Sequence, residues 1–367
     1  MNPDNTKWQA SARALPQVRE MSAYVPGMQP QDDGWIKLNT NELPYPASPA
    51  VAKAVADEVA KLRLYPSPTS QSLREHIARM HGVEASQVFV GNGCDEVLAI
   101  LTRVFSGAES CAGMSQPSYS LYPVLAKIQN ANMQTIRFGR DMKLPVDEIV
   151  RSKANLFILT SPNAPTGVEF PLAEIRRAAE GFQGVFVIDE TYADFASHNC
   201  VEFVGKIPNV VVTRSLSKSY GLAGLRVGYA LASEEIIGLF DKVRDSYNVN
   251  RLSQAGALAA LQDTVYHDEL LAKVKATRAK FTDEARELGF FVHESGGNFV
   301  FAEPSDSKGR SGAKVAVSFY EYLKANKILV RYFPDDALTE SFLRISMGTP
   351  EQMERLAEAI QSWRRNA

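Results

Sequence analysis

Between about residues 38 and 265, short segments of apolar and often β-branched residues alternate with longer segments of helical periodicity. The apolar segments read QVFVG, NLFILT, GVFVID, NVVVT and VGYALA. Among the segments between them, 94–105 and 171–182 have the spacing of amphipathic helices. A strand that is apolar at every position is buried on both faces. The alternation therefore predicts an α/β fold, in which helices cover a mostly parallel sheet.

The remainder of the chain has a different pattern. After about residue 266, a long helix is expected over 268–290, and the strand-like segments FFVHES, NFVFAE, KILVRY and SFLRISM then mix with two further helices. Such a mixture predicts a smaller α+β unit. The first residues contain several prolines and show no regular period. The expected division is an N-terminal arm (1–37), a large domain (38–265) and a small C-terminal domain (266–367).

Composition argues against several classes of protein. Lys and Arg number 40 and Asp and Glu number 42, a net charge of −2 that argues against a general nucleic-acid or membrane-surface binder. No apolar segment resembles a signal peptide or could span a bilayer. The three scattered cysteines favour a reducing compartment, and the five histidines lack the spacing of metal ligands. We therefore expect a cytoplasmic protein without a metal site.

Polar residues follow four of the predicted strands directly. Asn163 follows the strand at 155–160, in the turn SPNAPTG, and Asp189 ends the strand at 184–189, three residues before Tyr192. Ligands of open α/β sheets bind beyond the carboxyl ends of the strands, so these side chains are expected in one site. The other two strands are followed by Ser215, Ser217 and Lys218, and by the glycine turn GNGCDE, which opens a helix.

Each of these motifs alone also has an ordinary structural interpretation. GNGCDE lacks the lysine of a phosphate-binding P-loop, SPNAPTG is a typical turn, and an aspartate that ends a strand often caps a helix. Most single lysines are solvated surface residues. It is the occurrence of all four motifs at strand ends that favours a common ligand.

Pyridoxal 5′-phosphate explains all four motifs. Its ring nitrogen would stay protonated beside a carboxylate such as Asp189, Asn163 and Tyr192 could bind its ring oxygen, and the amine of Lys218 could capture its aldehyde. Its phosphate needs hydroxyls, a cation and helix-terminal N–H groups. These are offered by Ser215, Ser217, Arg226 and the backbone near Gly93 and Cys94.

The motifs SPNAPTG, VIDETYADF and SLSKSYGLAGLRVGY, with LYPSPTSQSLREHIA, QPSYSLY and FLRISMGT, run nearly from end to end of the chain. In these motifs the chain resembles the fold-type-I pyridoxal-phosphate enzymes of the class-II aminotransferase group. Within that group it is similar to the histidinol-phosphate aminotransferase family. The resemblance implies a homodimeric transferase of histidine biosynthesis, which interconverts L-histidinol phosphate plus 2-oxoglutarate with imidazole acetol phosphate plus L-glutamate.

The resemblance also implies a role for individual residues. Lys218 would be the Schiff-base lysine and proton carrier, Asp189 the partner of the pyridine nitrogen, and Tyr192, with Asn163, a ligand of the 3′-oxygen. Further cofactor contacts are implied for Gly93, Cys94, Asp95, Tyr119, Ser215, Ser217 and Arg226, and for a Tyr65 that reaches across the dimer. Substrate contacts are implied for Tyr24, Asn41, Asn163, Arg331 and Arg344.

Two arginines bear on the choice of substrate. The segments KILVRY and SFLRIS alternate in polarity, so Arg331 and Arg344 can stand on one face of neighbouring strands and share a dianion. This favours a phosphorylated substrate over a plain aromatic amino acid, the substrate of an aromatic aminotransferase. A threonine-phosphate decarboxylase stays open. A non-enzymatic pyridoxal-phosphate-binding regulator is disfavoured, because only a short arm precedes the predicted sheet.

Overall fold

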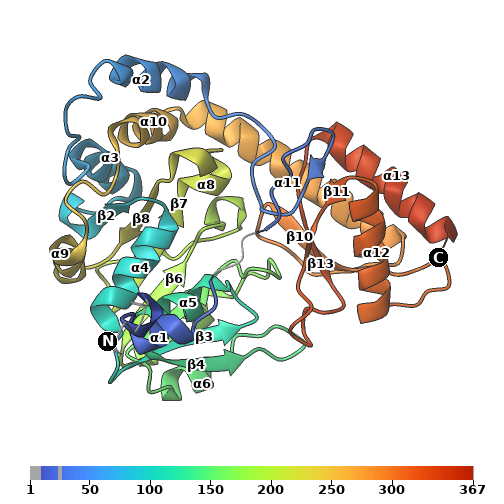
Figure 1. The fold of residues 1–367 in the computed structure, drawn as a ribbon, viewed down its shortest axis with the longest axis horizontal. Helices are drawn as coiled ribbons and strands as arrows, with labels where there is room; N and C mark the ends of the chain where they lie inside the picture. Colours follow the sequence, from blue (N-terminus) through green and yellow to red (C-terminus); the bar gives the residue numbers. More distant parts are fainter. Residues whose placement is uncertain (1–9, 24–26, 367) are drawn as a thin grey trace, which may run out of the picture.

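The computed structural model of the protein describes residues 10–23 and 27–366. Figure 1 shows two units beside each other, a larger one that contains most of the sheet and a smaller one formed by the C-terminal part of the chain. The 24-residue helix α11 (Thr264–Glu287) runs from the larger unit into the smaller one. Across the part of the chain that the structure describes, no helix is both long and apolar enough to cross a membrane.

The strands are β1 (Ile36–Lys37), β2 (Val88–Gly91), β3 (Cys111–Gln116), β4 (Asn132–Arg137), β5 (Leu156–Thr160), β6 (Val185–Asp189), β7 (Val210–Ser215), β8 (Gly228–Leu231), β9 (Phe291–Val292), β10 (Phe299–Glu303), β11 (Ile328–Leu329), β12 (Arg331–Tyr332) and β13 (Leu343–Ser346). The helices are α1 (Pro16–Glu20), α2 (Pro49–Val59), α3 (Gln71–His81), α4 (Cys94–Phe105), α5 (Leu121–Ile128), α6 (Val146–Arg151), α7 (Leu172–Gly181), α8 (Leu216–Ser219), α9 (Glu234–Val243), α10 (Arg251–Gln262), α11, α12 (Ala313–Ala325) and α13 (Pro350–Asn366).

The larger unit is built on a seven-stranded sheet in the order β2-β8-β7-β6-β5-β3-β4. Only β8 runs antiparallel to its neighbours, so the predicted α/β fold with a mostly parallel sheet is confirmed. The five apolar segments became β2, β5, β6, β7 and β8. The sequence analysis missed β3 and β4. The first of these consists of small and polar residues, and the second is a partly exposed edge strand.

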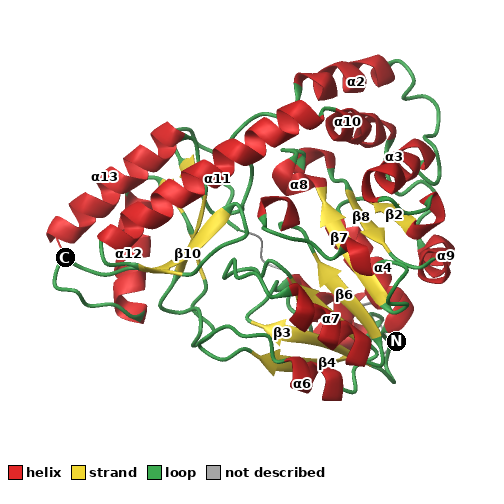
Figure 2. Cartoon of the chain, turned by 180° about the vertical axis from the view of Figure 1, so that it is seen from behind, coloured by secondary structure: helices red, strands yellow, loops and turns green. Residues whose placement is uncertain are grey.

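Both faces of the large sheet are covered by helices (Figure 2). Along β6, Phe186 and Ile188 point into a core shared with α3, α6, α7 and α10, whereas Val187 points into a second core shared with α4, α5 and α9. Successive side chains of a strand face opposite sides. A strand between two such cores must therefore be apolar at every position, which explains the apolar runs.

The smaller unit contains a four-stranded antiparallel sheet, β12-β13-β10-β9, which packs with α11, α12 and α13 around one core. Ile36 and Leu38 also belong to this core, and β1 pairs with β11. The segment at 36–38 thus joins the smaller unit, although Leu38 was expected at the beginning of the large domain. The expected strand KILVRY is divided at Val330, because β11 pairs with β1 and β12 pairs with β13.

Candidate active site

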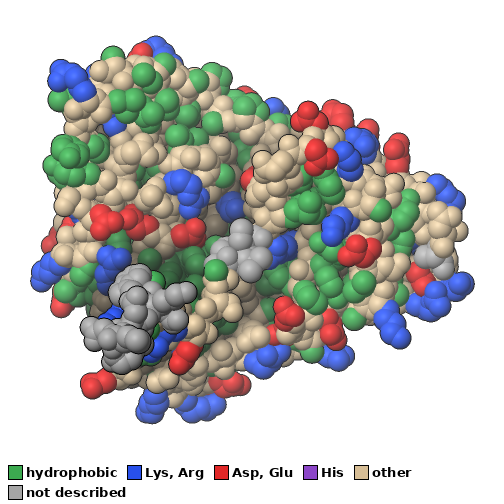
Figure 3. Space-filling view, viewed as in Figure 1, with side chains coloured by type: hydrophobic (Ala, Val, Ile, Leu, Met, Phe, Trp, Pro, Cys, Tyr) green, Lys and Arg blue, Asp and Glu red, His purple; other side chains and the backbone are tan. Residues whose placement is uncertain are grey.

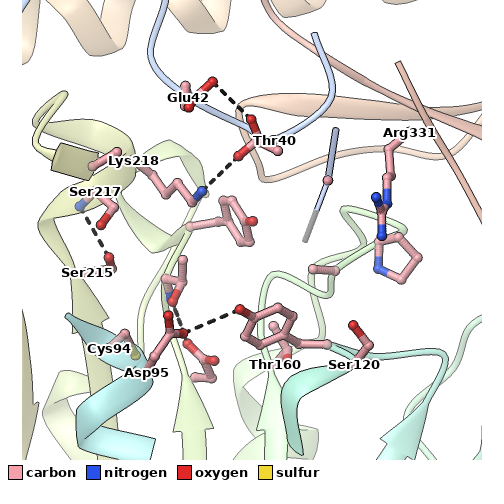
Figure 4. Close-up of a pocket in the computed structure, with 18 of the residues that line it drawn as sticks. Thr40, Glu42, Cys94, Asp95, Ser120, Thr160, Ser215, Ser217, Lys218 and Arg331 are labelled. Carbon is pink, nitrogen blue, oxygen red and sulfur yellow. Dashed lines mark hydrogen bonds between the residues drawn. The ribbon is translucent and has the colours of Figure 1, made fainter. Parts of the chain in front are cut away.

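A pocket lies between the two units, at the carboxyl ends of β5, β6 and β7. The start of α4, the segment at 39–42 and the strands β12 and β13 complete its wall. Figure 4 shows Lys218 and Arg331 entering this space from opposite sides. The structure brings together most of the predicted site residues on the wall, namely Cys94, Asp95, Tyr119, Asp189, Tyr192, Ser215, Ser217, Lys218, Arg226, Arg331 and Arg344.

Four predicted residues do not line this pocket, and the position of a fifth is not described. Gly93 directly precedes the wall residue Cys94, and Asn41 lies between the wall residues Thr40 and Glu42 with its own side chain fully buried. Asn163 is buried too, and its Nδ2 donates to the carbonyl oxygen of Pro117 at 3.1 Å. Tyr65 is 77% exposed and stacks on Tyr247 outside the pocket. Tyr24 lies outside the described residues.

Lys218 enters the pocket from the short helix α8, which follows β7. The hydroxyl of Ser215 caps this helix by accepting from the backbone N–H of Ser217 at 3.2 Å. The ammonium group of Lys218 donates to the carbonyl oxygen of Thr40 at 3.0 Å (Figure 4). Burial, with the positive charge of Arg344 next in importance, lowers the pKa of Lys218 from 10.5 to about 8. An appreciable fraction of this amine is therefore neutral, and nucleophilic, near neutral pH.

A buried network of ion pairs and hydrogen bonds stabilises the position of α8. The guanidinium of Arg214 donates to Glu190 Oε2 and to Asp194 Oδ1, each at 2.8 Å. Asp194 also accepts from the hydroxyl of Ser219, the residue after Lys218, at 2.5 Å. Sequence reasoning missed this network, because its members read as ordinary charged residues. This network attaches the backbone around Lys218 to the strands β6 and β7.

Asp189 ends β6 at the floor of the pocket and is almost fully buried. It accepts from the hydroxyl of Tyr122 at 2.6 Å, and from the hydroxyl and the N–H of Thr191 at 2.7 and 3.1 Å. Burial raises the pKa of Asp189, and these hydrogen bonds oppose the rise. A cationic ring nitrogen beside this carboxylate would offset the cost of its burial.

Tyr122 is a second residue that sequence reasoning missed. Its ring is fully buried. Its hydroxyl donates to Asp189 Oδ2 and also lies 2.7 Å from Thr160 Oγ1. The only available signal was the motif QPSYSLY, which offers Tyr119 and Tyr122 three residues apart. Nothing in the motif distinguishes the tyrosine on the pocket wall from the one beneath it.

The far end of the pocket collects groups that suit a phosphate. Arg226 Nη1 lies 3.4 Å from Ser217 Oγ, and Arg226 Nη2 lies 3.2 Å from Asp95 Oδ2. The helix α4 begins at Cys94 on the pocket wall, and the first N–H groups of a helix have no partner within it. The preceding Gly93 has a φ of 83°, a conformation that favours glycine, and a Cβ atom there would displace the guanidinium of Arg226.

These groups fit pyridoxal 5′-phosphate at three points. A buried carboxylate could pair with a ring nitrogen, a lysine with a lowered pKa could capture an aldehyde, and a helix N-terminus, hydroxyls and a guanidinium could together bind the phosphate. The residues that would hold the group are Asp189, Tyr192, Lys218, Ser215, Ser217, Arg226, Cys94 and Tyr119. Within residues 10–23 and 27–366, no three or more His, Cys, Asp or Glu side chains are arranged to hold a metal ion.

The lowered pKa of Lys218 predicts how capture of the cofactor depends on pH. Only the neutral amine attacks an aldehyde, so the capture rate in cofactor-free protein should rise with pH, with a midpoint near 8, and level off above it. Stopped-flow absorbance after mixing with pyridoxal 5′-phosphate measures this rate. A small lysine derivative, measured in parallel, corrects for titration of the cofactor itself. A midpoint near 10.5 in the protein would contradict the prediction.

Arg331 and Arg344 stand on neighbouring strands, as expected. They are directly opposite each other in the antiparallel pair β12–β13. Both guanidiniums lie against the ring of Phe333, at 5.6 and 5.4 Å from its centre. Arg344 Nη2 also donates to the carbonyl oxygen of Asn39 at 2.9 Å. The pair brings two positive charges to the pocket wall opposite the helix N-terminus of α4.

Comparison with known proteins agrees with this geometry. Residues 33–360 match the family model of aminotransferase class I and II. The chain is similar to the histidinol-phosphate aminotransferase of Geobacter sulfurreducens, with 45% identity over 349 residues that cover 94% of this chain and 97% of that one. A relative of the same name from Synechocystis is 41% identical over 347 residues, which cover 95% of this chain and 97% of the relative.

The fold is similar to that of solved structures. The crystal structure of histidinol-phosphate aminotransferase from Sinorhizobium meliloti in complex with pyridoxal-5′-phosphate matches with a TM-score of 0.88. The match covers 97% of this chain and 98% of that one at 24% identity. Such a likeness establishes the fold-type-I architecture of this chain.

Proposed function

Since this chain belongs to the class I and II aminotransferase family, we propose that it transfers an amino group between L-histidinol phosphate and 2-oxoglutarate, forming imidazole acetol phosphate and L-glutamate. The observation that carries the proposal is one pocket whose wall includes both a lysine with a lowered pKa and two adjacent arginines. A phosphorylated amine would place its nitrogen near Lys218 and its dianion near Arg331 and Arg344.

The cofactor is pyridoxal 5′-phosphate, which when bound supplies an electron-withdrawing ring that stabilises negative charge on the substrate's α-carbon. Asp189 holds a proton on the ring nitrogen, because a buried carboxylate favours a cationic partner. The anion site at α4 and Arg226 holds the phosphate. These residues bind and orient, and they leave the proton transfers of the reaction to Lys218.

In this proposal Lys218 Nζ would accept the proton of the substrate's α-carbon and deliver it to the C4′ carbon of the cofactor. A general acid and base works best when its pKa lies near the operating pH, and the pKa of Lys218 lies near 8. Thr40 is suited to guide the amine, since its carbonyl oxygen already accepts from it. The network behind α8 limits the movement of the lysine backbone.

The substrate assignment is tested by titrating the cofactor-loaded protein with a panel of amines and following the visible absorbance. Histidinol phosphate should change the spectrum at a lower concentration than histidinol, an aromatic amino acid or phosphothreonine. An aromatic amino acid acting at the lowest concentration would favour an aromatic aminotransferase. Release of carbon dioxide from phosphothreonine, without turnover of glutamate, would favour the decarboxylase.

We also propose that the active unit is a homodimer in which Tyr65 reaches the partner's phosphate site. Apolar side chains gather over α2 and the loop that follows it, at the upper left of Figure 3. Exposed large apolar residues in and beside this region are Val59, Leu62, Leu64, Tyr65 and Tyr247. A gathering of exposed apolar side chains is typical of a protein–protein interface. Tyr65 is 77% exposed and does not line the pocket of its own chain, which leaves it available to a second copy.

Mixing two impaired variants tests the shared site. Lys218→Ala subunits and Tyr65→Phe subunits, once exchanged into heterodimers, should recover activity above the mean of the two parents. The reason is that one of the two sites then receives an intact lysine and an intact tyrosine. Differently tagged subunits would establish that exchange has occurred, and sedimentation would establish the dimer. Exchanged heterodimers without any recovery would argue that each chain forms its own complete site.

We further propose that the protein works in the cytoplasm, in histidine biosynthesis. Its cysteines, Cys94, Cys111 and Cys200, are all free in the described structure. Free thiols, two of them buried, suit a reducing compartment. Cell fractionation followed by immunodetection measures the location directly.

A further inference from the structure

Asn41 occupies an unusual position behind the pocket wall. It is fully buried, and its backbone has a φ of 54°, a left-handed conformation that asparagine and aspartate tolerate better than most residues. Its carbonyl oxygen accepts from Asn298 Nδ2 at 2.9 Å, and its Nδ2 donates to the hydroxyl oxygen of Tyr192 at 2.9 Å. Asn41 therefore joins the smaller unit to a tyrosine that follows β6.

Ser346 favours one orientation of the Asn41 amide. The hydroxyl oxygen of Ser346 accepts the backbone N–H of Asn41 at 2.9 Å, and the hydroxyl proton is available to Asn41 Oδ1, which lies 2.8 Å away. With Oδ1 as the acceptor in that contact, Nδ2 is the group that faces Tyr192. Ser346 belongs to the paired strand β13, which holds this hydroxyl in place.

The direction of the Asn41 amide determines the direction of the Tyr192 hydroxyl. An oxygen that accepts from an amide N–H cannot donate its own proton to the same group. The O–H of Tyr192 therefore points to an acceptor other than Asn41. We infer that Asn41 is a positioning residue that turns the Tyr192 O–H toward the 3′-oxygen of the bound cofactor. This inference rests on the proposed function only for the identity of the cofactor.

The substitution Asn41→Asp tests the inference with little change of size. Aspartate tolerates the positive φ, but an ionised carboxylate only accepts, so the Tyr192 O–H would turn toward residue 41. A Tyr192 O–H that donates to the ionised 3′-oxygen of the cofactor stabilises the ionised form of that oxygen. Loss of this hydrogen bond should therefore raise the pH midpoint of the absorbance change of the bound cofactor. The dissociation constant of the cofactor should also rise, by about tenfold for one lost hydrogen bond.

Two controls separate the hydrogen bond from the added charge. Asn39→Asp places the same charge in the same buried segment, on the pocket wall, where the side chain contacts Met28 rather than Tyr192. Asn41→Asp should raise the midpoint more than Asn39→Asp does. In a Tyr192→Phe background, the effect of Asn41→Asp should fall to that of Asn39→Asp. Equal effects of Asn41→Asp with and without the Tyr192 hydroxyl would overturn the inference.

Ser346→Ala provides a second route, which keeps Asn41 and adds no charge. Without the serine hydroxyl the amide can reverse, so the midpoint should rise by less than in Asn41→Asp, and only when the Tyr192 hydroxyl is present. This variant decides the matter if Asn41→Asp does not fold. No rise in Ser346→Ala would then overturn the inference. The titration needs no substrate, so it is independent of histidinol phosphate. A protein that binds no pyridoxal 5′-phosphate would instead contradict the proposed function.

Discussion

Lys218→Ala is expected to lower the rate of amino-group transfer by at least about a thousandfold. Proton transfer by a positioned side chain contributes about 10²–10⁴-fold, and the same variant also loses the nucleophile of the pocket. The group that contacts Lys218 Nζ cannot replace it, because the carbonyl oxygen of Thr40 carries no proton to transfer. Single-turnover conversion of the bound cofactor by L-glutamate, followed by absorbance, measures the loss.

Two comparisons make this loss specific. Lys206→Ala removes an exposed lysine from the same unit, outside the pocket, and should leave the rate unchanged. In Lys218→Ala, a small primary amine such as methylamine should restore part of the rate, since it can occupy the space that the side chain vacates. Circular dichroism should show that both variants fold. Substantial glutamate turnover by Lys218→Ala without added amine would rule out the lysine as proton carrier.

The sequence was most informative where local pattern alone decides the structure. β6 had to be apolar at every position, because Phe186 and Val187 enter different cores. The same pattern predicted that β6 ends at Asp189, which lies at the floor of the pocket. The sequence pattern could not predict whether a strand runs parallel or antiparallel to its neighbours. An antiparallel strand such as β8 has the same apolar pattern as its parallel neighbours when both faces are buried.

The parts of the site that escaped prediction depend on contacts between distant segments. Asn41 and Ser346 lie 305 residues apart in the sequence, and Tyr122 and Asp189 lie 67 apart. Motifs identify the type of residue at a position, but they do not identify its hydrogen-bond partner. For Asn41 the resemblance implied a substrate contact, and the structure adds that its Nδ2 donates to the hydroxyl oxygen of Tyr192.

The second large effect is expected at the pair of arginines. Arg331→Ala should weaken binding of histidinol phosphate by about ten- to a hundredfold, because a charge-assisted hydrogen bond contributes roughly 1.5–3 kcal/mol. Arg331 stands opposite Arg344, and both guanidiniums contact Phe333, so the two charges can reach one dianion. Absorbance titration of the cofactor-loaded protein gives the dissociation constants of histidinol phosphate and of unphosphorylated histidinol.

Comparing histidinol phosphate with histidinol isolates the contribution of the phosphate to binding. Histidinol lacks the dianion, so Arg331→Ala should weaken its binding far less than that of histidinol phosphate. Arg331→Lys keeps the charge but loses the planar fork that binds two oxygens at once, and should fall between wild type and Arg331→Ala. L-Glutamate should also bind more weakly to Arg331→Ala, because its side-chain carboxylate would occupy the same place as the phosphate. Equal losses for histidinol phosphate and histidinol would mean that Arg331 does not contact the phosphate, and the proposed substrate would then lose its strongest structural support.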